Sequence, residues 1–140
     1  MKKLVLLLLP VFFLLLQSCG GTLTNSITVK NSATNNVYLN IFGQLITVAP
    51  GQTQVIKNVQ KGDYDYQTSF DVPSGVSGSS VEGNGTGTLT MAPSTKITIF
   101  FTSRIQSQQG GGGAGGEQSN YILIITISSS DKSSGESTSP

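Results

Sequence analysis

The chain of 140 residues has no histidine, no tryptophan and a single cysteine, and only 11% of its residues are charged. Histidine is the commonest general base of enzymes and a common metal ligand, so its absence argues against a catalytic triad or a transition-metal site. One cysteine excludes an internal disulfide and a multi-cysteine zinc site. A formal net charge of +1 gives no electrostatic basis for nucleic-acid binding. We therefore expect no enzyme, no catalytic residue, no cofactor and no nucleic-acid partner.

The N-terminus has the composition of a secretory signal peptide. Lys2 and Lys3 precede an apolar run, Leu4 to Leu16, that only Pro10 interrupts. As a helix this run would be about 20 Å long, whereas the apolar core of a bilayer is about 30 Å thick. A short apolar run behind a basic start is typical of an export signal that is cleaved, here residues 1–18. The alternative is a short membrane helix that stays attached.

The end of this run resembles the lipobox of bacterial lipoproteins. The stretch reads Leu16-Gln17-Ser18-Cys19-Gly20, in which Leu16, Ser18 and Cys19 match the family pattern and Gln17 departs mildly from it. The resemblance implies that the Cys19 thiol, the best nucleophile available, receives a diacylglyceryl group and that cleavage occurs just before it. The alternative is an incidental free thiol at Cys19.

The same resemblance implies a location and a partner. Acyl chains such as palmitate on Cys19 would attach the protein stably to a membrane of the bacterial cell envelope. Residues 19–23 would then form a short lipid tether. Because Gly20 rather than aspartate follows the cysteine, the resemblance implies the outer membrane in a Gram-negative cell.

Residues 24–128 have the pattern of one all-β domain. Short runs of β-branched and aromatic residues alternate with turn residues, and no stretch shows helical spacing. The runs cover residues 27–29, 37–42, 45–48, 55–56, 63–70, 88–91, 97–101 and 121–127. Seven or eight strands of this spacing predict a small two-sheet antiparallel β-sandwich of immunoglobulin-like size. The stretch Val48–Tyr66 resembles the turn-strand-turn pattern of small extracytoplasmic immunoglobulin-like and transthyretin-like modules, which implies a fold rather than an activity.

Alternation in three runs predicts which side chains face the core. The expected inward residues are Val37, Leu39 and Ile41; Tyr64, Tyr66 and Phe70; and Ile97, Ile99 and Phe101. The opposite phase leaves Asp63, Asp65 and Gln67 toward solvent.

Three other segments lack this alternation. Residues 73–87 are rich in glycine and serine and predict a loop. Residues 106–119 include a glycine run and predict a flexible loop, without the lysine that a phosphate-binding loop needs. Residues 129–140 are rich in serine and predict a disordered tail.

Exposed aromatic residues are the clearest candidates for binding. Tyr38, Asn40 and Phe42 have the same phase in residues 37–42, so we expect the two aromatic side chains to share the outer face of that strand with Asn40. Two rigid aromatic rings on a sheet can contact a sugar or a protein. The alternative is that another part of the domain covers this face.

Three carboxylates form a weaker candidate. Asp63, Asp65 and Asp71 lie close in sequence, and Ca²⁺ prefers oxygen ligands. The residues around them do not have the spacing of a calcium loop, so the favoured interpretation is the solvated face of a strand.

The run Tyr121–Ile127 is the most apolar stretch after the signal peptide. Its composition predicts a strand covered on both faces. It pairs either with residues 95–104 of its own chain or, donated to a neighbouring molecule, with the sheet edge of a second copy.

These observations favour a non-enzymatic, lipid-anchored envelope protein that acts through protein–protein interaction or as a structural component. The alternative is a surface-exposed module that binds a glycan or another ligand.

Overall fold

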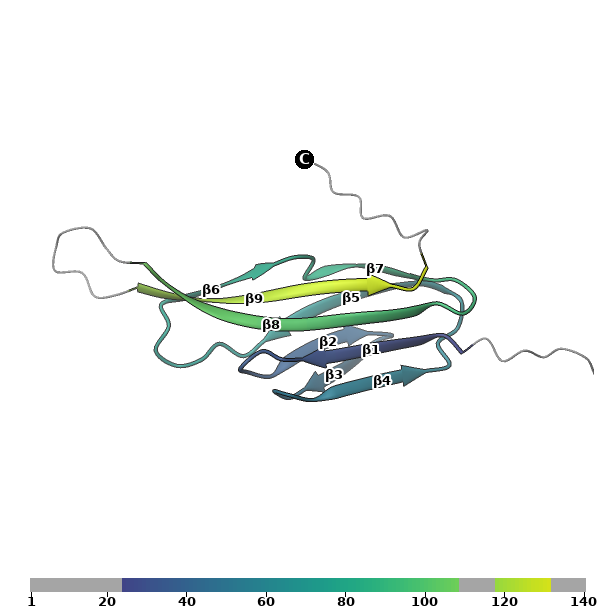
Figure 1. The fold of residues 1–140 in the computed structure, drawn as a ribbon, viewed down its shortest axis with the longest axis horizontal. Coiled ribbons are helices and arrows are strands. Elements are labelled where there is room, and N and C mark those ends of the chain that lie inside the picture. The colour runs from purple at the N-terminus through teal and green to yellow at the C-terminus, as the bar shows by residue number, and fades with distance from the viewer. Residues whose placement is uncertain (1–23, 109–117, 132–140) are drawn as a thin grey trace, which may run out of the picture.

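The computed structural model describes residues 24–108 and 118–131, and these form an all-β domain with nine strands (Figure 1). The strands are β1 (Ser26–Asn31), β2 (Val37–Ile41), β3 (Gln44–Val48), β4 (Thr53–Lys57), β5 (Gly62–Phe70), β6 (Gly78–Glu82), β7 (Thr86–Met91), β8 (Lys96–Gln108) and β9 (Gln118–Ser129). Among these described residues no helix is long and apolar enough to cross a membrane. Within Val48–Tyr66, β4 lies between a turn at Pro50 and Gly51 and an irregular segment, residues 58–61.

The strands form two sheets, which confirms the predicted two-sheet β-sandwich. The five-stranded sheet has the order β4-β1-β8-β9-β6 and the four-stranded sheet has the order β3-β2-β5-β7. The expectation of purely antiparallel pairing is wrong, because β1 pairs with β8 and β6 with β9 in parallel. Parallel neighbours need long connections, and the intervening strands of both sheets supply them.

The core lies between the two sheets and contains the side chains that alternation predicts. Val37, Leu39 and Ile41 of β2 are buried, and so are Ile97, Ile99 and Phe101 of β8. On β5 Tyr66 is buried, while Tyr64 and Phe70 are half-buried against the same cluster. The alternation of apolar and polar residues therefore identified the inward side chains of strands that have one face on the core and the other in solvent.

Strand β6 corrects the prediction that residues 73–87 form a loop. All five of its residues are exposed, so Gly78–Glu82 carries no alternation that a sequence could reveal. The strand is held by backbone pairing to β9 at the edge of the five-stranded sheet. Only three residues, 83–85, separate it from β7, which begins at Thr86.

Strands β8 and β9 are longer than the apolar runs that predicted them. They form one antiparallel hairpin whose register extends from Ile97 opposite Ser129 to Gln108 opposite Gln118. Residues 106–108 and 118–119 of the predicted loop are thus strand, while residues 109–117 lie outside the described residues. The predicted tail also begins too early, because the Ser130 amide donates to the Lys96 carbonyl.

Candidate functional site

The outer face of the four-stranded sheet is polar on β2, β5 and β7, whereas Leu45 of β3, directly opposite Asn40, is 64% exposed there. Alternation turns one set of side chains of β2, β5 and β7 away from the core, while their neighbours along each strand are buried or half-buried. The outward set comprises Tyr38 and Asn40 on β2; Asp63, Asp65, Gln67 and Ser69 on β5; and Thr86, Thr88 and Thr90 on β7. We call this surface the polar face.

Two aspartates of the polar face are bonded to threonines of the next strand. Thr88 Oγ1 donates to Asp65 Oδ1 at 2.7 Å, and Thr90 Oγ1 donates to Asp63 Oδ1 at 2.8 Å. Both bonds join residues that the β5–β7 register places directly opposite each other. Cross-strand pairs of this kind stabilise a sheet, so these carboxylates have a structural partner.

The third aspartate of the weak calcium candidate lies elsewhere. Asp71 follows the end of β5, six residues beyond Asp65, which at about 3.3 Å per residue separates the two by about 20 Å. Asp63, Asp65 and Asp71 therefore do not converge on one ion. No group of three potential metal-ligating side chains gathers within residues 24–108 and 118–131.

Asp71 instead fixes Tyr38. The Tyr38 hydroxyl donates to the two carboxylate oxygens of Asp71 at 3.1 and 3.0 Å, and Asn36 Nδ2 donates to Oδ2 at 3.1 Å. Asn35 Nδ2 donates to the Asp71 carbonyl at 3.1 Å. Because its hydroxyl is held at one end, the half-buried Tyr38 ring has a fixed orientation on the polar face.

The expectation that Phe42 shares this face with Tyr38 is wrong. Phe42 and Gly43 both have positive φ, 58° and 68°, so the chain turns there and β2 ends at Ile41. Positive φ at both central positions is typical of the tight turns that join two neighbouring strands. The Phe42 ring lies 4.6 Å from that of Tyr64, an inward residue of β5, in an edge-on contact. The structure therefore places one candidate aromatic residue on the polar face and not the other.

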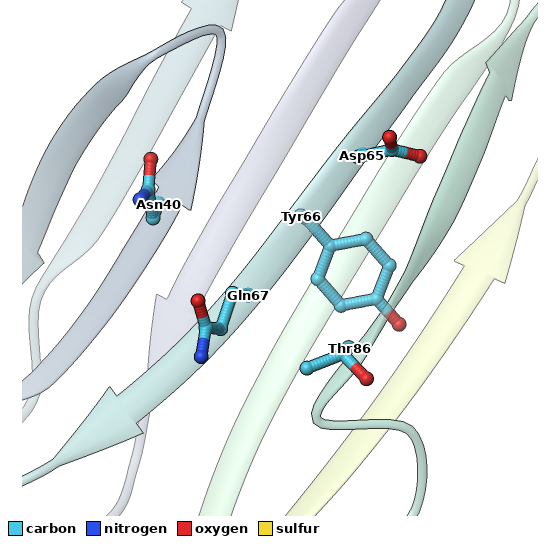
Figure 2. Close-up of a pocket in the computed structure, with 5 residues that line it drawn as sticks. All are labelled: Asn40, Asp65, Tyr66, Gln67 and Thr86. Atoms are coloured by element: carbon cyan, nitrogen blue, oxygen red, sulfur yellow. The ribbon is translucent and has the colours of Figure 1, made fainter.

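A shallow, open depression of about 480 Å³ lies on the polar face (Figure 2). Its lining residues are Asn40, Asp65, Tyr66, Gln67 and Thr86. Asn40 lies opposite Gln67 and Gln67 lies opposite Thr86, so these three form one row across β2, β5 and β7. The sequence marked Asn40 and Gln67 as outward residues, but only the strand pairing brings Thr86 beside them.

Tyr66 belongs to the wall between the depression and the core. Its hydroxyl donates to the Asn84 carbonyl at 3.0 Å, and its burial raises the pKa of the phenol above 10.0. Gly87 makes room for the ring, because a Cβ atom there would lie 3.1 Å from Tyr66 Cε1. The position of Tyr66 is thus set by packing and one hydrogen bond.

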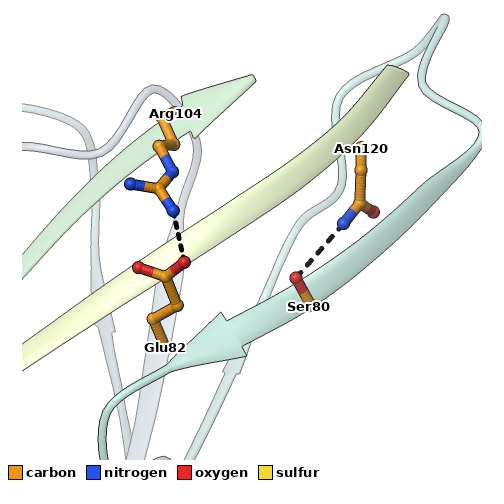
Figure 3. A network of polar contacts seen from close by, with 4 residues as sticks. All are labelled: Ser80, Glu82, Arg104 and Asn120. Carbon is orange, nitrogen blue, oxygen red and sulfur yellow. Dashed lines mark hydrogen bonds and ion pairs between the residues drawn. The ribbon is translucent and has the colours of Figure 1, made fainter. Parts of the chain in front are cut away.

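The β8–β9 hairpin is a second exposed feature. Arg104 of β8 forms an ion pair with Glu82 of β6, so the two side chains bridge across β9 (Figure 3). Asn120 Nδ2 donates to Ser80 Oγ at 3.3 Å. Between these pairs Ile122, which faces away from the core cluster, is only 4% exposed. Ile105, the residue of β8 that follows Arg104, is 57% exposed.

Two candidates remain, the lipidation residue Cys19 and the apolar run Tyr121–Ile127, and the structure describes only the second. The lipidation candidate Cys19 lies outside the described residues. The run Tyr121–Ile127 forms most of β9, which pairs with β8 and β6 of its own chain. Its Tyr121 and Leu123 side chains are fully buried in the core. This is the intramolecular arrangement that the sequence favoured.

Comparison with known proteins adds no relative: no protein-family model, no curated protein and no solved structure matches the chain.

Proposed function

We propose that the protein is a non-enzymatic, lipid-anchored protein of the bacterial envelope that contacts a partner protein through its β8–β9 hairpin. The lipobox-like stretch ending at Cys19 supports the anchor, and Gly20 supports the outer membrane in a Gram-negative cell. The absence of histidine from the whole sequence supports a role without catalysis.

The observation that carries the proposal is the parallel register of β1 and β8. Ser26 lies beside Lys96, where β8 begins, and both strands run away from that end. Strand β8 continues for twelve residues to Gln108, or about 40 Å at 3.3 Å per residue. In Figure 1 the described chain enters β1 at the right, and the hairpin extends to the opposite, left-hand end.

This register gives the two ends of the sandwich different roles. Ser26 is seven residues after Cys19, and a fully extended chain of seven residues is at most about 25 Å long. The β1 end would therefore lie close to a membrane that holds the lipid, and the hairpin would point away from it. The ion pair between Arg104 and Glu82 braces the hairpin, while the exposed Ile105 side chain offers an apolar contact.

Photo-crosslinking in intact cells tests this arrangement. A photoreactive amino acid at Ile105 samples the hairpin, and the same amino acid at Val55 is the matched control. Val55 is similarly exposed, at 50%, but lies on β4 opposite Thr28 in β1. We expect a discrete adduct with an envelope protein from position 105 only, and its loss in the Cys19→Ser variant.

Two results would contradict the proposal. Adducts of equal yield from both positions would mean that the hairpin is not the contact. Unchanged membrane fractionation and unchanged crosslinking of Cys19→Ser would mean that a lipid on this residue does not place the domain.

A further inference from the structure

We propose that the polar face is a sugar-binding site in which Asn40, Gln67 and Thr86 bind the hydroxyl groups of a neutral polysaccharide beside the Tyr38 ring. The site lies on the four-stranded sheet, whereas the hairpin belongs to the five-stranded sheet. The inference is therefore independent of the proposed protein contact.

The first argument is that this row of polar groups is uncommitted. Within the described residues, the side chains of Asn40, Gln67 and Thr86 form no hydrogen bond with the protein. Their neighbours on the same face differ, because Thr88 and Thr90 are bonded to aspartates. Three of the five lining residues thus have donors and acceptors available to a ligand, while Asp65 and Tyr66 are bonded within the protein.

The second argument is the match between these groups and sugar hydroxyls. A side-chain amide both donates and accepts hydrogen bonds, as does a threonine hydroxyl, and so does each hydroxyl of a sugar. The row crosses three neighbouring strands at a spacing of about 4.8 Å. Groups fixed on a sheet at this spacing can bind successive hydroxyls with little loss of backbone entropy.

The third argument is the aromatic ring of Tyr38, which lies beside the row. Tyr38 precedes Asn40 by two residues on the same side of β2, which places the two side chains about 7 Å apart. Its hydroxyl is held by Asp71, so the ring presents a fixed apolar surface next to the amide row. A polar row beside one aromatic ring suits a ligand that has hydroxyl edges and a C–H face.

The fourth argument is charge. Strands β3, β2, β5 and β7 contain Asp63 and Asp65 but no lysine or arginine, and Asp71 follows β5 directly. This negative field disfavours phosphorylated polymers and acidic sugars. The face therefore selects a neutral saccharide, and its openness admits an internal unit of a chain rather than only a free end.

Saturation-transfer NMR tests the site with the full-length protein in detergent micelles. The probes are cellotetraose, maltotetraose and chitotetraose, with tetragalacturonic acid as the charged comparison. We expect at least one neutral tetrasaccharide to bind with a dissociation constant on the order of 1 mM, and tetragalacturonic acid not to bind.

Matched glutamine variants locate the binding. Gln67→Ala removes the central amide and should weaken the affinity about tenfold, the loss expected for about one hydrogen bond. Gln54→Ala removes an equally exposed glutamine from β4 and should leave the affinity unchanged. Both residues are exposed, so unchanged far-UV circular dichroism and melting temperatures confirm that the variants are folded.

Three outcomes would overturn the inference. One is that none of the neutral probes gives a signal at about ten times the expected dissociation constant. The second is binding that Gln67→Ala does not weaken. The third is tetragalacturonic acid binding as strongly as the neutral probes.

Discussion

The side chain of Asn31 is a polar group in the interior of the domain. It is fully buried at the end of β1 and forms three hydrogen bonds. Its Nδ2 donates to the Asn35 carbonyl at 2.9 Å and to the Val48 carbonyl at 2.7 Å, and its Oδ1 accepts from the Ala33 amide at 2.8 Å. This one amide therefore fastens β1 and the loop after it to the end of β3 in the other sheet.

We expect Asn31→Ala to destabilise the domain by about 4–5 kcal/mol. The three hydrogen bonds, two of them buried and one partly buried, contribute about 1 kcal/mol each, and leaving the Ala33 amide without a partner adds about 1–2 kcal/mol. That loss is a large part of the roughly 5–15 kcal/mol that stabilises a typical domain. Urea unfolding followed by far-UV circular dichroism measures it, since the chain has no tryptophan to report by fluorescence.

The isosteric Asn31→Asp variant separates hydrogen bonding from the loss of volume. Its carboxylate would replace two N–H donors and would face the Asn35 and Val48 carbonyls. Burial and these oxygens would raise its pKa in the folded protein above the unfolded value of about 3.9. The variant should therefore lose stability relative to the native protein as the pH rises from about 4 to 7.

The control for both variants is Asn36→Ala, whose side chain forms a single exposed bond to Asp71 and should cost less than about 1 kcal/mol. A cost below about 1 kcal/mol for Asn31→Ala would refute this account of the buried amide. So would an Asn31→Asp variant that gains relative stability as the pH rises.

Two further predictions concern a glycine and a tyrosine. Gly83→Ala should cost more than about 3 kcal/mol, because at a φ of 89° its new Cβ would lie 2.2 Å from the Ile125 carbonyl oxygen. Gly75→Ala, with a φ of 87° and open space around it, should cost about 1 kcal/mol, and equal urea midpoints for the two variants would contradict this reasoning. For Tyr66, the raised pKa means that the unfolded chain loses its proton first, so stability should fall as the pH rises above about 10. Tyr66→Phe should reduce that fall, and an identical pH profile between pH 9 and 11 would count against it.

The sequence predicted those parts of the fold in which a buried face imposes a period of two. Strands β2 and β5 alternate because one side meets the other sheet and the opposite side meets water. Strand β6 gave no such signal, since its five residues are exposed and only its backbone is paired. The hairpin ends of β8 and β9, residues 102–108 and 118–120, are mostly polar, which is why the predicted hairpin was too short.

The sequence predicted which single residues of the polar face point outward, but not which of them lie side by side. Alternation predicted that Asn40 and Gln67 point outward. Their adjacency depends on the β2–β5 register, which could not be predicted from the sequence. Phe42 was misplaced because its left-handed backbone ends the strand one residue early. Gly43 is a turn signal, but phenylalanine is not a residue that sequence patterns place at the first central position of such a turn. Asn31 gave no signal of its link to the other sheet, because its bond to the Val48 carbonyl joins residues that are 17 positions apart in the chain.

The two proposed binding surfaces should work without affecting each other. Coupling between sites requires an element with two arrangements that both ligands bias. The polar face belongs to the sheet β3-β2-β5-β7, and the hairpin belongs to the other sheet, with a filled apolar core between them. Its buried side chains, Leu39 and Phe101 among them, leave no room for a second packing. Under the two proposals, the domain would hold a polysaccharide along its side while its hairpin, about 40 Å from the β1 end, would contact a protein farther from the membrane.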